Sequence, residues 1–317
     1  MKDWSSRAGL VLVILLCASF CLTELAEVDL HWHLLAGERI LREGRVPRED
    51  DFTYTSSGRP WIDLHWLFQV AVAAAYRGAG WPGLDLLKIG CVAGAFLLAL
   101  VAAARRGTRR AVLAPLALVA VLAAQERFTL RPEAASFLFL AGLLALLGER
   151  RSHPGLLLLL PPLVALWANC HALYVVGLAV LCLTAAGDFI ESRWLPGVRA
   201  GGRGAARAAL LPGVALLSIA ASAATPFGFA GWALPWRLLF ERIGADNVYA
   251  RNIAEFQAPF GGYGPTASIA AFATLVVIVL AGTVAGRCAA RLADVLVLAA
   301  LLFLALLARR NIPLFAL

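Results

Sequence analysis

The chain has 317 residues, of which 61% are hydrophobic and 15% are charged, and its mean hydropathy is +0.79. Soluble domains usually have about 45–50% apolar and about 25% charged residues, so this composition excludes an ordinary soluble domain, a disordered chain and a disulfide-framed secreted protein. The formal net charge of +8 comes from arginines that cluster in short loops between apolar stretches. This distribution is typical of a polytopic membrane protein and does not favour nucleic acid as a partner.

Nine apolar segments approach the length of about 20 residues that a membrane-spanning helix needs. They are residues 8–25, 83–104, 111–127, 132–148, 154–169, 171–187, 208–224, 266–286 and 293–309. The first segment ends without a small-residue cleavage site, so we expect an uncleaved anchor. The six cysteines lie in or beside these segments and are expected to act as small hydrophobic residues. The sequence therefore predicts an all-α polytopic membrane helix bundle of about nine spans, with residues 1–317 forming a single transmembrane domain.

Residues 64–80 (LHWLFQVAVAAAYRGAG) are ambiguous, because they are apolar but include His65, Gln69 and Arg77. If this segment does not span and the N-terminus is cytoplasmic, the inside loops carry 14 basic residues against the four acids Asp3, Glu149, Asp188 and Glu191. The basic residues are Lys2, Arg7, Arg105, Arg106, Arg109, Arg110, Arg150, Arg151, Arg193, Arg199, Arg203, Arg207, Arg287 and Arg291. Since basic loops favour the cytoplasmic side, we predict a non-spanning helix at 64–80 and a cytoplasmic N-terminus.

This topology leaves two long external segments, 26–64 and 225–265. In the first, ELAEVDLHWHLLAGERILREG is expected to form an amphipathic helix on the outer surface that ends at Gly44. Its apolar residues at near-helical spacing are Trp32, Leu34, Leu35, Ile40 and Leu41. Asp29 precedes this helix, where it serves either as an N-cap or as a functional carboxylate.

The tetrapeptide DLHW occurs twice, at Asp29–Trp32 and at Asp63–Trp66, each time where the chain enters an apolar segment. Asp29 and His33 share one helix face, whereas His31 points elsewhere. Together with His65, these residues form either an acid/base site beside the bilayer or a metal site. Their spacing matches no standard metal motif, so we predict no metal ligands, although a divalent cation stays an open alternative.

Basic residues on the external side suggest a second feature. In QERFTLRPE, Pro132 begins the next helix, and Arg127 and Arg131 would ring one external cavity together with His171, which lies in the turn of a helical hairpin. Arginine binds phosphate bidentately, so an anionic lipid headgroup is the expected ligand; the alternative is interfacial snorkelling. Arg251, in the second external segment, either binds a hydrophilic substrate or belongs to a solvated face.

Taken together, these motifs resemble the GT-C glycosyltransferase superfamily, especially uncharacterised bacterial membrane proteins near the protein O-mannosyltransferases and lipid A aminoarabinose transferases. The stretches that carry the resemblance are ELAEVDLHWHLLAGERIL, VPREDDFTYTSSGRPWIDLHWL, TLRPE, LWANCHALYVVGL and TPFG…IAEFQAP. The resemblance implies an inverting transfer of a sugar from a polyprenyl-phosphate donor to an acceptor at the outer face of the bacterial cytoplasmic (inner) membrane.

The resemblance also implies roles for individual residues. An acid in the first external loop would act as the base, which falls on Asp29, with Glu27 as the rival and Asp63 as a further acid. The expected substrate-binding residues are His31, His33, His65, Arg127, Arg131, His171 and Arg251. Such proteins commonly extend well beyond 317 residues, so we expect a C-terminally truncated or shortened relative. The alternatives are a transporter and a non-catalytic lipid-binding scaffold.

Overall fold

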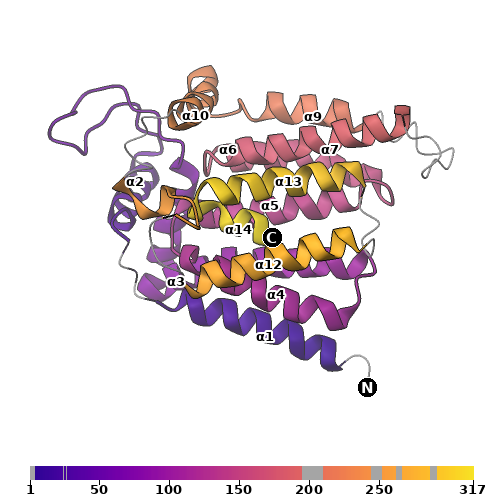
Figure 1. Ribbon diagram of the computed structural model, residues 1–317. Coiled ribbons are helices and arrows are strands. Elements are labelled where there is room, and N and C mark those ends of the chain that lie inside the picture. The colour runs from indigo at the N-terminus through magenta and orange to yellow at the C-terminus, as the bar shows by residue number, and fades with distance from the viewer. Residues whose placement is uncertain are drawn as a thin grey trace.

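Figure 1 shows the computed structural model of the chain, which describes residues 4–23, 25, 27–194, 210–243, 252–261, 266–285 and 291–317. Over these ranges the chain is all-α, and paired extended backbone is limited to an isolated bridge between Glu49 and Pro60. The predicted all-α fold class is therefore confirmed for the described part of the chain.

The long helices lie side by side with their axes in roughly one direction (Figure 1). They are α1 (Trp4–Cys21), α3 (Trp66–Arg105), α4 (Arg110–Ala124), α5 (Pro132–Gly148), α6 (Leu160–Ala168), α7 (Tyr174–Trp194), α9 (Leu210–Ala221), α12 (Ala267–Val284) and α13 (Leu292–Leu307). Each predicted apolar segment lies on one of them, with boundaries shifted by a few residues. Of these helices, α3, α7 and α12 are long and apolar enough to cross a membrane.

Helix α3 bends sharply at Gly80, where φ is 62° and ψ is −144°. The bend folds the chain back so closely that a Cβ at Gly83 would lie 2.2 Å from the carbonyl oxygen of Ala75. The first half of α3 begins beside α2, and just after the bend the Trp81 ring packs 6.1 Å from that of His31 at the start of α2. Residues 64–80 therefore form a separate helix whose two ends both lie near α2.

Helix α2 (Leu30–Glu43) packs on the first half of α3 and ends at Gly44 in the left-handed conformation, as predicted. Its buried residues are Leu30, His33, Ala36, Gly37 and Ile40. Of the predicted apolar residues, Ile40 is buried against the protein, whereas Leu35 is 57% and Leu41 is 38% exposed. The side of α2 that packs on α3 carries small residues, which allow the two helices to approach closely. A position of α2 on the outer membrane surface stays a prediction.

Two hydrophobic clusters form the interior. The larger one joins α1, the second half of α3, and α4 to α7, and the smaller one lies beneath α2 around Leu30, Phe68 and Leu130. After α13 the chain makes a short 3-10 turn, η4 (Arg309–Asn311), and then α14 (Ile312–Ala316), whose apolar side chains are buried. The cysteines that the structure describes are all free, as expected for small hydrophobic residues.

Candidate functional site

A cavity of about 380 Å³ opens at the end of the bundle where α2 lies. It is lined by Asp29, Trp32, His33, Leu64, His65, Arg131, Pro132, Glu133, His171, Ala172, Leu238, Glu255 and Arg310. These residues come from both predicted external segments, from the α4–α5 and α6–α7 turns, and from the C-terminal turn. The cavity is therefore assembled from five parts of the chain that are distant in sequence.

The three predicted acids occupy different positions. Asp29 lines the cavity at the N-cap position of α2, but its side chain makes no capping hydrogen bond. Glu27 is paired with the Nε of Arg131 at 2.5 Å. Asp63 is buried and is not part of the cavity lining. Its Oδ1 instead accepts hydrogen bonds from the backbone N–H of His65 (3.0 Å) and from the side-chain amide of Gln69 (3.2 Å). Asp29 is exposed; among the described residues its side chain forms no hydrogen bond or ion pair, although its charge acts on the nearby His33.

Three of the four candidate histidines meet at the cavity wall. The ring of His65 lies 5.9 Å from that of His33 and 5.4 Å from that of His171, between centroids. The predicted shared face of Asp29 and His33 is present, since both residues line the cavity. His31 points away and is exposed, as the helical spacing predicted, so its expected role in substrate binding is not supported by its position.

The cavity histidines are uncharged near neutral pH. Burial lowers the pKa of His33 to about 4 and that of His65 to about 3, and it lowers the pKa of His171 well below its ordinary value. His171 is fixed by a 2.8 Å hydrogen bond between its Nδ1 and the hydroxyl of Ser136. That hydroxyl also accepts a 2.8 Å hydrogen bond from the indole N–H of Trp167. Neutral imidazoles at these positions can donate or accept hydrogen bonds with a polar ligand.

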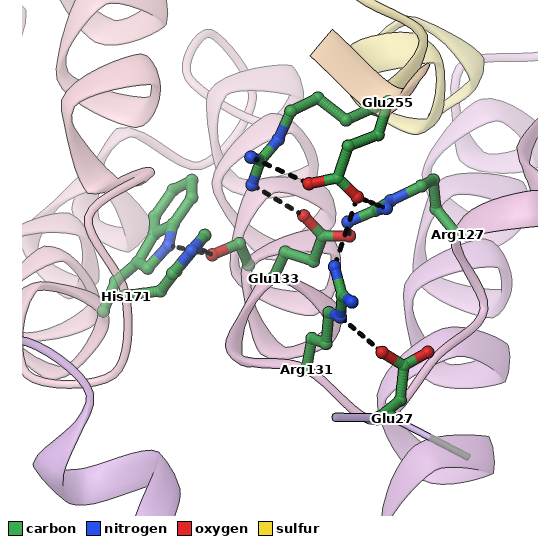
Figure 2. A network of polar contacts seen from close by, with 9 residues as sticks. Glu27, Arg127, Arg131, Glu133, His171 and Glu255 are labelled. Atoms are coloured by element: carbon green, nitrogen blue, oxygen red, sulfur yellow. Dashed lines mark hydrogen bonds and ion pairs between the residues drawn. The ribbon is translucent and has the colours of Figure 1, made fainter. Parts of the chain in front are cut away.

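Figure 2 shows a continuous network of arginines and glutamates beside His171. Its members are Glu27, Arg127, Arg131, Glu133, Glu255 and Arg310. We call it the arginine–glutamate network. It contains three positive and three negative side chains, so within it the charges balance.

The network corrects one expectation about the arginines. Arg127 was predicted to ring the cavity, but it is buried behind the lining, in close contact with Glu133 and Glu255. Arg131 does line the cavity, as predicted, although its guanidinium already pairs with Glu27 and, at 3.2 Å, with Glu255. The physical reason is that buried guanidinium groups need compensating charge, which carboxylates from other segments supply.

Arg310 is a cavity residue that the sequence reasoning missed. It pairs with Glu133 at 3.1 Å and with Glu255 at 3.5 Å. A signal for it was present, because the alternation of predicted spans places the residues after 309 on the same side as the external loops. Arg251, the remaining predicted residue, lies outside the part of the chain that the structure describes.

An aromatic cluster covers one side of the cavity. The ring of Trp32, which lines the cavity, lies 4.6 Å from that of Phe52 and 5.4 Å from that of Trp61. Nearby, Asp50 accepts hydrogen bonds from the backbone N–H groups of Phe52 (2.9 Å) and Thr53 (3.0 Å), as a turn residue does. Trp32 therefore packs against two other aromatic side chains of the first external segment.

Histidine and carboxylate side chains are common metal ligands. Within the described ranges, no group of three or more His, Cys, Asp or Glu side chains is arranged to hold a metal ion. Comparisons of the chain with known protein families, with curated proteins and with solved structures gave no match.

Proposed function

We propose that this chain is a membrane glycosyltransferase that moves a sugar from a polyprenyl-phosphate donor to an acceptor hydroxyl, with inversion. The observation that carries the proposal is Asp29, an exposed carboxylate that lines a cavity of about 380 Å³ beside His33 and forms no side-chain hydrogen bond or ion pair with the described residues. A carboxylate in that state is available to take a proton from a bound hydroxyl. Sequence resemblance to the GT-C superfamily is the second support.

The chemistry needs few groups. Asp29 accepts the proton of the acceptor hydroxyl, and the oxygen of that hydroxyl attacks the anomeric carbon of the sugar. The bond between that carbon and the phosphate oxygen breaks, and polyprenyl phosphate leaves with the electron pair. Arg131 and Arg310 line the same cavity as Asp29 and are the cations that would stabilise the charge on the leaving phosphate.

The proposed topology places this cavity at the outer face of the bacterial cytoplasmic membrane, with about nine spans and a cytoplasmic N-terminus. Contacts at the opposite end of the bundle support it, because basic residues gather there. Arg106 donates to the carbonyl of Leu144 at 3.3 Å, and the buried Arg150 binds Asp188 at 2.8 Å. Residues 64–80 are proposed not to span, since both ends of that segment lie near α2.

The test is sugar transfer from a radiolabelled polyprenyl-phosphate-sugar in liposomes, comparing Asp29→Asn with the parent chain. Loss of a positioned base should lower the rate by about 10²–10⁴-fold, whereas the similar size of asparagine should preserve the fold. Asp51→Asn is the matched control, because Asp51 is an exposed acid of the same external segment that pairs with Arg39. Parent-like transfer by Asp29→Asn would remove Asp29 from this role and leave Glu27 as the next acid to test.

One observation favours the alternative of a non-catalytic lipid-binding protein. Each arginine at the cavity is already paired with a glutamate, so none presents an uncompensated charge to a donor phosphate. A transporter is less well supported, because the charge of the buried Lys88 is already compensated: it pairs with Asp85 at 3.3 Å and donates to the carbonyl of Thr23, just beyond the end of α1. Absence of transfer by the parent chain with every donor would favour the lipid-binding alternative.

A further inference from the structure

Glu255 is the carboxylate on which all three arginines of the network converge. Its Oε2 contacts Arg127 closely and Arg131 at 3.2 Å, and its Oε1 lies 3.5 Å from Arg310 (Figure 2). These arginines come from the α4–α5 turn and the C-terminal turn, so they approach Glu255 from distant parts of the chain. A carboxylate offers two oxygens, whereas a phosphate offers up to three in a tetrahedral arrangement that suits convergent guanidinium groups.

The charge balance explains what Glu255 does at the cavity. Together with Glu27 and Glu133, it neutralises the three arginines, so an incoming anion meets no net positive charge within the network. Burial raises the pKa of Glu255, but the charges of Arg127, Arg310 and Arg131 outweigh this effect and lower the pKa below its usual range. Glu255 is therefore ionised near neutral pH and competes directly with any anion for the arginines.

The two glutamates that share these arginines are held differently. Glu133 is buried in the first turn of α5, inside the bundle. Glu255 belongs to η3 (Ala254–Phe256), a short 3-10 turn in which no residue is buried, and its own side chain is 23% exposed. Moving Glu255 out of the cavity therefore displaces no buried residue of η3. The contacts at stake are those of the Phe256 ring with Arg310 (4.7 Å) and of the Gln257 carbonyl with the N–H of Arg309 (2.9 Å), whereas moving Glu133 would disturb the core.

We propose that Glu255 is an internal counter-anion that occupies the binding position of a phosphate group, and that a phosphate-bearing ligand binds by displacing it. The arginines Arg127, Arg131 and Arg310 then form the phosphate cradle, and Glu133 stays in place to orient them. The inference rests on the proposed function only for the identity of the ligand, a lipid-linked phosphate. Displacement itself requires no sugar transfer.

The experiment measures binding by the full chain in detergent, using isothermal titration calorimetry with farnesyl phosphate, inorganic phosphate and uncharged farnesol. Glu255→Gln removes the competing charge and keeps the side-chain size, so it should tighten farnesyl phosphate binding about tenfold, or about 1.4 kcal/mol. Farnesol binding should not change. A larger gain for farnesyl phosphate than for inorganic phosphate identifies a lipid-linked ligand, and equal gains identify free phosphate.

Glu38→Gln is the matched control, because it removes the same charge from an exposed ion pair with Arg77 on α2 and α3. It should leave the affinity unchanged. If Glu255→Gln does not fold, Glu255→Asp replaces it; the shorter acid reaches the arginines less well and should also tighten binding. Unchanged or weaker phosphate affinity in the folded variant overturns the inference. Tighter phosphate binding by Glu255→Gln, together with no sugar transfer by the parent chain, would instead overturn the proposed function alone.

Discussion

Burial decides the charge state of the side chains around the cavity. The histidines His33, His65 and His171 are kept neutral because the charged imidazolium would lose its hydration. Asp63, behind them, is affected in the opposite sense: burial raises its pKa to about 6, although hydrogen bonds from His65 and Gln69 act against this shift. Lowering the pH therefore stabilises the folded chain through Asp63 and destabilises it through the histidines.

These shifts predict that the free energy of unfolding falls as the pH drops from 6.5 towards about 4. In this range the unfolded chain, with an ordinary histidine pKa of 6.5, binds protons that folded His33 and His65 do not bind. Each such histidine contributes about 1.4 kcal/mol per pH unit. Below pH 6, folded Asp63 binds a proton that the unfolded acid does not, which offsets one histidine.

The measurement is the midpoint of thermal unfolding in detergent at pH 7, 6 and 5. His33→Gln should reduce the dependence on pH, because it removes one of the buried histidines. A midpoint in the parent chain that stays constant from pH 7 to pH 5 would show that the histidines are not buried as described.

Helix packing positions Asp29 and His33. Helix α2 approaches α3 so closely that a Cβ at Gly37 would lie 2.0 Å from the backbone oxygen of Gln69 and 2.9 Å from the Cβ of Ala73. Backbone cannot yield as a flexible side chain can, so the absence of a side chain at Gly37 sets the distance between the two helices. His33 lies one turn before this contact, and its position in the cavity depends on it.

Gly37→Ala should therefore separate α2 from α3, lower the stability by about 1–3 kcal/mol and reduce sugar transfer. Gly78→Ala is the matched control: Gly78 lies on α3, and a Cβ there meets nothing within 4 Å. Thermal unfolding in detergent compares the two variants. Equal stability of the two would mean that the close approach of α2 and α3 is not required.

The molecule has two chemically different ends. One end holds the cavity, with Asp29, His171 and Glu255 brought together from distant segments. The other end holds the ion pairs of Arg150 and Arg151 with Asp188, and the backbone N–H of Leu292 donates to Glu191 at 2.5 Å. Arginines occur at both ends, but those at the cavity are balanced by three glutamates. Under the proposed topology the other end is the cytoplasmic side, where the positive-inside rule expects basic residues.

Cysteine labelling tests this orientation in a background without the native cysteines. We expect Ser57→Cys, in the exposed turn of the first external segment, to react with a membrane-impermeant reagent in intact cells. Thr108→Cys, in the exposed α3–α4 turn, should react only after the membrane is opened. Labelling of Thr108→Cys from the periplasmic side would contradict the topology and the non-spanning assignment of residues 64–80.

The amino-acid sequence alone determined the features that depend on neighbouring residues. The apolar segments predicted the helices, because a helix in lipid must present apolar side chains along its whole length. Gly44 ended α2 and Pro132 began α5 as predicted, since both effects are local to the backbone. The spacing of four residues placed Asp29 and His33 on one face for the same reason.

Only the tertiary structure decided which polar groups meet. The two DLHW copies looked equivalent, yet Asp29 lines the cavity and Asp63 is turned into the protein. No spacing rule connects Glu255 with Arg127 or with Arg310, because ion pairs between distant segments depend on how the helices pack. The sequence therefore shows which side chains carry charge, and the tertiary structure determines which of them pair. The reason is that a buried charge is compensated by whichever groups lie near it in space.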